Sequence, residues 1–309
     1  MSNQPRTTET SDSPLGVVLA ASAFFIWGLS PIYWKTLVSV PAFEILMHRM
    51  IWSFVFLAPL VLLRGHLHDF LTALSSGRIL LILMGTTVIV GGNWFLFIWA
   101  INSGHILQTS LGYYINPLVN VLLGVVFLKE RLRRLQLVAV ALAAVGVVYL
   151  TLSYGQFPWV SLALAFSFGF YGLIRKVVPV GPLVGLTVET LLLSVPATAY
   201  LIYIDHAGRG AFLNAGASIT LLLMGAALVT GLPLLLFTMG TKLLRLATVG
   251  FLQYIAPSCT FLLAVFIYRE PLVPAQLFTF GLIWTALAIY SYDSVKAYKR
   301  PKELATDLH

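Results

Sequence analysis

The sequence has 309 residues, of which 59% are hydrophobic and only 10% are charged, and its mean hydropathy is +0.91. This composition lies far outside the range of soluble globular proteins and predicts an integral membrane protein. A net charge of +8 favours nucleic-acid binding in a soluble protein, but here the basic residues lie between apolar segments, which argues against that class.

Ten apolar segments each have about 20 residues, the length that crosses a hydrocarbon core of roughly 30 Å as a helix. In chain order they lie at 15–34, 43–63, 79–101, 105–128, 134–153, 157–174, 182–204, 217–239, 243–267 and 274–292. We therefore predict an all-α integral membrane protein with ten transmembrane helices. Residues 1–14 are expected to form a disordered cytoplasmic tail and residues 294–309 a basic cytoplasmic tail.

A stretch of the first half recurs in the second half, 140 residues further along the chain. Tyr114-Ile115-Asn116-Pro117 matches Tyr254-Ile255-Ala256-Pro257, and ten of the 24 positions in 114–137 are identical in 254–277. Chance would give roughly two or three identities in so apolar a chain, so the match indicates an internal duplication. Five spans per repeat is an odd number, which predicts two inverted five-helix repeats, 15–153 and 154–293.

The basic residues indicate the orientation of the spans. If the N-terminus is cytoplasmic, 15 of the 19 Lys and Arg lie on the cytoplasmic side, and only Lys35, Arg209 and Arg269 lie outside, with Arg49 inside a span. This asymmetry predicts that both termini are cytoplasmic. It also places Glu130 inside and its repeat equivalent Glu270 outside, as inverted repeats require.

The second span carries three ionisable residues, Glu44, His48 and Arg49. Glu44 and His48 are four apart and share a helix face, whereas Glu44 and Arg49 diverge by about 140°. Ionisable groups at membrane depth usually face the bundle interior or a wet cavity, which favours a gate, a proton-coupling site or an anchor for a charged substrate. The alternative is an interfacial charge cluster, because Glu44 lies near the span's end and Arg49 can snorkel.

Glu189 is the ionisable residue at greatest depth in the seventh span, roughly 10 Å from Pro182 along the helix. A lone carboxylate there is costly, so we expect it to be paired, with Arg175 or Lys176 as partners, or else protonated. A coupling role and a structural ion pair both remain open.

The fourth span has the most polar stripe in the chain, with Gln108, Gly112, Asn116, Asn120 and Gly124 recurring every four residues. Midspan Pro117 and its equivalent Pro257 each deprive a carbonyl of its helical donor. We predict that this region lines a substrate cavity, although amides and small residues also mediate helix packing. The predicted cavity residues are Tyr113, Asn116, Asn120 and Gln253, with Asn93 of the third span and an aromatic box of Trp27, Tyr171 and Tyr254.

Four patterns together resemble the RarD-type permeases, which belong to the EamA family of the drug/metabolite transporter superfamily. They are FIWGLSPIYWK at 25–35, EILMHR at 44–49, SLGYYINPL at 110–118 with KER at 129–131, and GFLQYIAP at 250–257. The resemblance covers nearly all of 15–293. It implies the ten-helix fold of two EamA-type repeats and a place in the bacterial inner (cytoplasmic) membrane.

These observations favour a transporter that moves a small polar metabolite or drug-like molecule by alternating access, by efflux or exchange. An intramembrane enzyme and a structural membrane subunit are the alternatives. No zinc-protease motif, nucleophile elbow or P-loop occurs in the sequence, so we expect no catalytic residues, no metal, no cofactor and no drive by ATP. The expected partners are the lipid bilayer, a small-molecule substrate and possible coupling protons.

The charge asymmetry makes a prediction about topology. A reporter that is active only outside the membrane should be active when fused near Tyr154 or Gly208 and inactive near Arg133 or Lys299. Enzyme activity of the fusions in intact cells measures this directly. An active reporter at Arg133 would contradict the inverted arrangement.

Overall fold

The computed structural model describes residues 12–269 and 274–306. Ten segments in these ranges are long and apolar enough to cross a membrane, and each lies where the sequence predicts a span. They are α1 (Pro14–Lys35), α2 (Ala42–Leu63), α4 (Gly77–Asn102), α5 (Ile106–Phe127), α6 (Arg134–Ser153), α7 (Trp159–Val177), α8 (Pro182–His206), α9 (Ala217–Leu243), the interrupted span Leu246–Ile267, and α12 (Pro274–Thr306). The all-α fold of ten transmembrane helices is confirmed.

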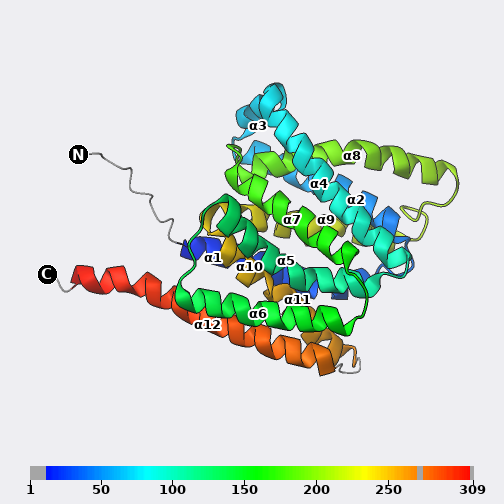
Figure 1. Ribbon diagram of the computed structural model, residues 1–309. Coiled ribbons are helices and arrows are strands. Elements are labelled where there is room, and N and C mark those ends of the chain that lie inside the picture. Colours follow the sequence, from blue (N-terminus) through cyan, green and yellow to red (C-terminus); the bar gives the residue numbers. More distant parts are fainter. Residues whose placement is uncertain (1–11, 270–273, 307–309) are drawn as a thin grey trace.

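The start of α1 and the end of α12 lie at the same end of the helix bundle, and α12 extends beyond the other helices there (Figure 1). We call this the basic end, because it carries Arg133, Lys176 and Arg245. The opposite end carries Lys35, which lies over the Tyr268 ring, and the segment 207–216 that connects α8 to α9.

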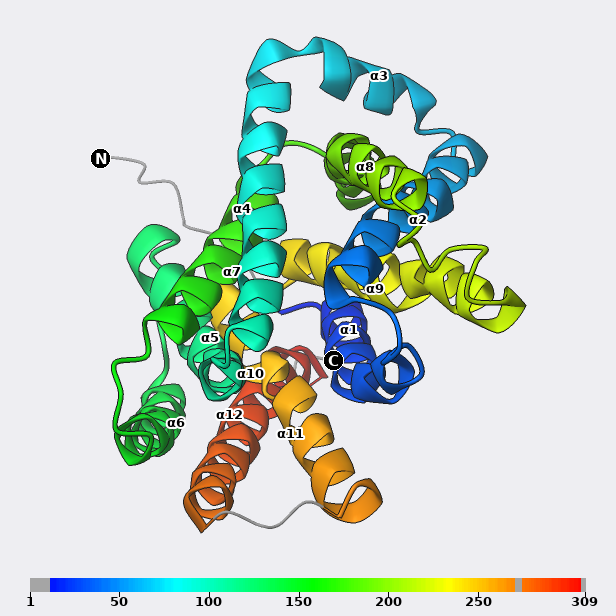
Figure 2. The same cartoon turned by 90° about the vertical axis from the view of Figure 1, so that its right-hand side faces the viewer.

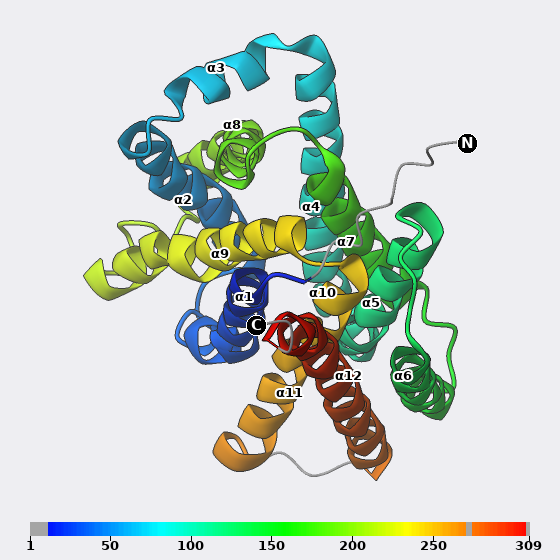
Figure 3. The same ribbon diagram turned by 90° about the vertical axis from the view of Figure 1, so that its left-hand side faces the viewer.

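Helices of the two halves interleave. The most extensive contacts pair α1 with α9, α2 with α8, α5 with α7, and α6 with α12, so each joins a helix of the first half to one of the second. Figures 2 and 3 view the bundle from its two ends and show the short helix α3 (Leu67–Ser75) at its rim. The two halves of the chain therefore pack together as one body rather than as two separate ones.

The ninth span is not one helix. It consists of α10 (Leu246–Gln253), α11 (Ile255–Leu262) and a π-helical turn (Leu263–Ile267), with the first break at Tyr254. Pro257 explains that break, because a proline ring removes the hydrogen bond to the carbonyl four residues earlier, here that of Gln253, and clashes with it. The equivalent Pro117 leaves α5 continuous.

The interrupted span contacts two different helices of the first half. At the basic end α10 packs on α5, where a Cβ on Gly250 would lie 2.5 Å from the Pro117 carbonyl oxygen. At the opposite end α11 packs on α1, where a Cβ on Gly28 would lie 2.6 Å from the Cys259 Cβ. Only glycine permits either approach, so the break at Tyr254 directs the two halves of the span to different partners.

The short helix α3 was not expected from the sequence. Its apolar side chains Phe70, Ala73 and Leu74 pack with Leu83 of α4 and with valines of α8. Nine residues are too few to cross a membrane, so α3 is an amphipathic element that packs on α4 and α8 at the rim of the bundle.

Candidate functional site

Three amide side chains connect α5 to α10 in the interior. Asn120 is fully buried, and its Nδ2 donates to Gln253 Oε1 at 2.6 Å and to Asn116 Oδ1 at 3.3 Å. The Asn120 Oδ1 has no hydrogen-bond partner among the described residues. The structure thus brings together Asn116, Asn120 and Gln253, three of the predicted cavity residues, directly beside the break in the ninth span.

Arg49 lies apart from the other ionisable residues of α2. Its Nε donates to Thr230 Oγ1 at 2.8 Å, and its guanidinium carbon lies 4.9 Å from the Trp34 ring centroid and 5.3 Å from that of Trp94. Among the residues whose side chains the structure describes, no acceptor binds either Nη group, and no carboxylate forms an ion pair with Arg49. Tyr113, which is 48% exposed, lies within electrostatic range.

Glu44 and His48 line a separate cavity at the opposite end, as their shared helix face predicted. The cavity has a volume of about 450 Å³ and lies between α2, α8 and the connecting segment 207–216. Glu44 Oε1 accepts the Ala211 N–H at 2.6 Å and lies 3.9 Å from His48 Nε2. The predicted trio of span 2 therefore divides between two locations.

Glu189 is enclosed by partners and is 1% exposed. Its Oε1 accepts from Thr86 at 2.5 Å and lies 3.6 Å from Arg175 Nε, and its Oε2 accepts from Tyr171 at 3.0 Å. Of the two partners expected from the sequence, Arg175 forms the ion pair, whereas Lys176 donates to the carbonyls of Thr241 and Leu244.

Gly185 makes room for this ion pair. A Cβ at that position would lie 2.0 Å from Arg175 Nη1, so the guanidinium occupies the space that a side chain would fill. In the sequence, Gly181 and Gly185 have the spacing of a helix-packing motif, but Gly185 accommodates a buried cation instead.

The predicted aromatic box does not form as one unit. Trp27 and Tyr171 both contact Phe168, with ring centroids 5.9 and 6.0 Å apart. Tyr254 belongs to another apolar cluster, and its hydroxyl donates to the Tyr114 carbonyl at 3.3 Å. The expectation of a three-ring box was wrong because Tyr254 lies at the helix break, where it packs between α10 and α5.

Asn93 connects two helices. Its Nδ2 donates to the Leu164 carbonyl at 2.9 Å and to Ser167 Oγ at 2.8 Å, which ties α4 to α7. These bonds satisfy both amide hydrogens. A contact between Asn93 and a substrate stays a prediction.

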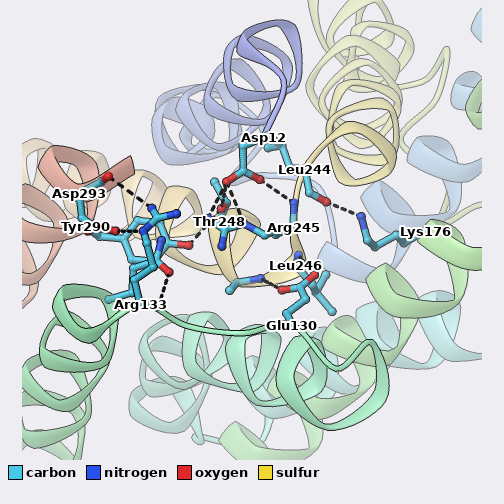
Figure 4. A network of polar contacts seen from close by, with 12 residues as sticks. Asp12, Glu130, Arg133, Lys176, Leu244, Arg245, Leu246, Thr248, Tyr290 and Asp293 are labelled. Atoms are coloured by element: carbon cyan, nitrogen blue, oxygen red, sulfur yellow. Dashed lines mark hydrogen bonds and ion pairs between the residues drawn. The ribbon is translucent and has the colours of Figure 1, made fainter. Parts of the chain in front are cut away.

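The basic end is closed by a network of charged contacts around the start of α10 (Figure 4). Glu130 accepts the backbone N–H groups of Leu246 and Ala247 at 2.6 and 2.9 Å, and Asp12 accepts that of Arg245 at 2.7 Å. Both carboxylates lie at the helix N-terminus, where unpaired N–H groups and the helix dipole favour negative charge. The equivalent residue Glu270 lies outside the described residues.

Two further ion pairs in Figure 4 join the halves. Asp12 binds the Arg245 guanidinium at 2.9 Å, and Arg133 Nε lies 2.5 Å from the Asp293 carboxylate. Burial lowers the pKa of Arg245, but the carboxylate of Asp12 and the neighbouring Tyr290 and Glu130 raise it, and the net shift is upward. Arg245 therefore stays charged, and the basic end is held by contacts between residues far apart in sequence.

Comparison with known proteins identifies the family. The model of the EamA-like transporter family matches residues 14–152. An "uncharacterized transporter" of Vibrio cholerae is 48% identical over 94% of this chain and 96% of its own length, and the protein RarD of Escherichia coli is 45% identical over 92% and 96%. The chain belongs to the RarD-type permeases of the EamA family.

The same fold occurs in a solved crystal structure that is only 19% identical. The alignment with that structure covers 91% of this chain and 98% of the other chain, with a TM-score of 0.68. The RarD relatives are bacterial, and the ten spans make this chain a bacterial multi-pass membrane protein. Within residues 12–269 and 274–306, no group of three or more His, Cys, Asp and Glu is arranged to hold a metal ion.

The Arg175–Glu189 contact predicts a strong energetic coupling. Replacing one partner leaves the other as a buried, unpaired charge, so Arg175→Met should lower the free energy of unfolding by about 3–5 kcal/mol. The double variant Arg175→Met, Glu189→Gln should recover much of that loss. Denaturation in mixed detergent micelles measures both effects.

The partly exposed Arg133–Asp293 pair is the matched control, since solvent screens it and its coupling should stay near or below about 1 kcal/mol. Equal coupling energies for the two pairs would contradict the structural role of the buried pair.

Proposed function

We propose that this permease moves a small polar molecule across the bacterial inner membrane by alternating access, by efflux or by exchange, with both termini cytoplasmic. The observation that carries the proposal is the unequal packing of the interrupted span, because α10 packs on α5 whereas α11 hardly contacts it. In an alternating-access carrier one end of the bundle is tightly packed while the other is open, and transport requires that the packed and open ends exchange.

The pattern of helix contacts supports inverted repeats. Inverted repeats predict that each pair of packed spans has an equivalent pair in which both spans are replaced by their repeat equivalents. The α1–α9 pair corresponds in this way to α7–α4, and the α5–α7 pair corresponds to the interrupted span packed on α1. All four pairs are present. The pairs α2–α8 and α6–α12 convert into themselves. A protein with this symmetry has a second arrangement of similar energy, in which the open and closed ends are exchanged.

Contacts between the two halves support closure at the basic end. Glu130, Asp12 and Arg133 of the first half bind partners of the second half there, and Gly250 contacts the Pro117 carbonyl just inside them. If the basic end is cytoplasmic, this conformation is closed to the cytoplasm and faces outward.

Arg49 and the amide chain are the proposed substrate contacts. The Arg49 guanidinium between Trp34 and Trp94 has no carboxylate partner and offers its two Nη amino groups to an anionic or carbonyl group, and Tyr113 lies within electrostatic range of it. Asn120 and Gln253 lie deeper, beside the break at Tyr254, so a substrate there would separate α5 from α10. Glu44, His48 and Glu189 remain candidates for coupling, but the pairing of Glu189 with Arg175 favours a structural role for it.

Transport is tested by counterflow of a broad labelled metabolite mixture in proteoliposomes. Uptake by the wild type identifies a substrate, and Asn116→Leu and Gln253→Leu should each reduce its counterflow at least about tenfold, because leucine removes the polar contact without adding a charge. Asn102→Leu, at the exposed end of α4, is the control and should transport normally.

Normal counterflow in both folded leucine variants would show that the amides only join helices. Turnover of a labelled compound into a product would favour the intramembrane enzyme, and the lack of any counterflow would favour the structural subunit.

The closure of the basic end is tested by chemical labelling. In a Cys259→Ser background, Tyr113→Cys should react with a membrane-impermeant maleimide added from the opposite end, because Tyr113 is exposed and lies within electrostatic range of Arg49 on the proposed substrate pathway. Glu130→Gln weakens the contact with α10 by about 1 kcal/mol, which changes the equilibrium between the two conformations about fivefold, and should slow that reaction by up to about threefold if the two conformations start with similar populations.

Asp69→Asn on α3 removes an exposed carboxylate from the same end without touching α10, and it should leave the labelling rate unchanged. If Glu130→Gln is folded and reacts as fast as the wild type, the contact between Glu130 and α10 does not control access.

A further inference from the structure

The cavity beside Glu44 contains an unsatisfied buried carboxylate oxygen. Glu44 is 1% exposed and lines the cavity; its Oε1 accepts the Ala211 N–H, whereas its Oε2 has no hydrogen-bond partner. Leaving a charged oxygen buried without a partner is costly, and a carboxylate oxygen can only accept hydrogen bonds. The missing partner is therefore a donor, and a cationic donor would stabilise the site most.

The neighbouring histidine defines a second unfilled position. Trp52 Nε1–H donates to His48 Nδ1 at 3.3 Å, so a neutral His48 carries its proton on Nε2. That Nε2 is buried, has no hydrogen-bond partner, and is too far from Glu44 Oε1, at 3.9 Å, to bond it. The two residues, which both line the cavity, thus hold one buried unpaired acceptor, Glu44 Oε2, and one buried unpaired donor, His48 Nε2–H.

Aromatic rings and a second carboxylate complete the walls. Phe212 stacks against His48 with ring centroids 4.9 Å apart and lies 6.0 Å from Trp52, and all three rings line the cavity. Asp205 of α8 also lines it, and no Lys or Arg does. Carboxylates beside aromatic faces are the usual recognition elements for ammonium groups.

We infer that this cavity, at the opposite end from the Glu130 network, is a binding site for a small organic ammonium ion. The ammonium donates to Glu44 Oε2, the apolar part of the ligand packs on Phe212 and Trp52, and His48 Nε2–H donates to an acceptor atom or a water next to the amine. A volume of about 450 Å³ suits a metabolite-sized ligand. The site does not depend on transport, since none of the amides between α5 and α10 contributes to it.

The connecting segment takes part in the site directly. The backbone N–H that binds Glu44 belongs to Ala211, and Phe212 follows it, so the segment 207–216 is held against α2 by the same carboxylate that receives the ligand. Ligand binding at Oε2 and segment docking at Oε1 therefore occur on one side chain.

The test uses the purified full-length protein in detergent, with phenethylamine as the probe and calorimetry as the measurement. Phenethylamine should bind, whereas 2-phenylethanol, which has the same shape without the charge, and 3-phenylpropanoate, which has the opposite charge, should bind at least about tenfold more weakly. Glu44→Gln should weaken phenethylamine binding at least about tenfold, because the neutral amide still accepts the Ala211 N–H but loses the charged acceptor.

Asp69→Asn is the matched control, since it removes a carboxylate that also lies beside a histidine but faces solvent outside the cavity, and its binding should equal that of the wild type. Phe212→Leu provides a second variant that leaves Glu44 intact and should weaken binding several-fold.

Three results would overturn the inference. They are the absence of phenethylamine binding to the folded wild type up to about 10 mM, equal affinity for 2-phenylethanol, and unchanged affinity in folded Glu44→Gln. Binding that is weakened in Phe212→Leu while counterflow of an unrelated substrate persists would support the ammonium site and separate it from the proposed transport pathway.

Discussion

The start of α10 is the point on which the arrangement of the two halves depends. A helix that begins inside a membrane protein exposes backbone N–H groups that lipid cannot satisfy. Here the carboxylates of Glu130 and Asp12 satisfy them, and both come from the first half of the chain. The same contacts that complete the secondary structure of the ninth span therefore also hold the halves together, so secondary and tertiary structure cannot be separated at this position.

Polar groups in the interior fall into satisfied and unsatisfied sets. Glu189 has three partners and little capacity left for a ligand, and Asn93 uses both amide hydrogens and so has no free donor. Glu44 Oε2, His48 Nε2 and the Nη groups of Arg49 retain theirs, and all lie on the side of the bundle away from the Glu130 network. Other buried atoms of the described residues also lack a partner, among them Asn120 Oδ1 in the interior and Gln136 Nε2 and Arg175 Nη1 nearer the basic end, so unused bonding capacity is spread through the bundle.

The spans could be predicted from the sequence because length and apolarity alone determine them, and the division of span 2 into two faces follows from helical periodicity. The break at Tyr254 could not, since Pro117 and Pro257 look alike in sequence but only one interrupts its helix. The partners of Glu130 could not be predicted from the sequence either, because a residue that caps a helix far away in the chain leaves no local sequence pattern. The contact of Trp34 with Arg49 could not be predicted either, because it depends on how α1 and α2 pack.

The space beneath Arg175 has a consequence for how this sequence can change. Because the guanidinium occupies the volume of a side chain at Gly185, any larger residue there displaces the cation from Glu189, while a glycine left without the arginine would border a void. A substitution at only one of these two positions therefore leaves either a displaced cation or a void at the other. Among related sequences, loss of the arginine and gain of a side chain at the glycine position should therefore appear together, and sequences that carry only one of the two changes should be rare.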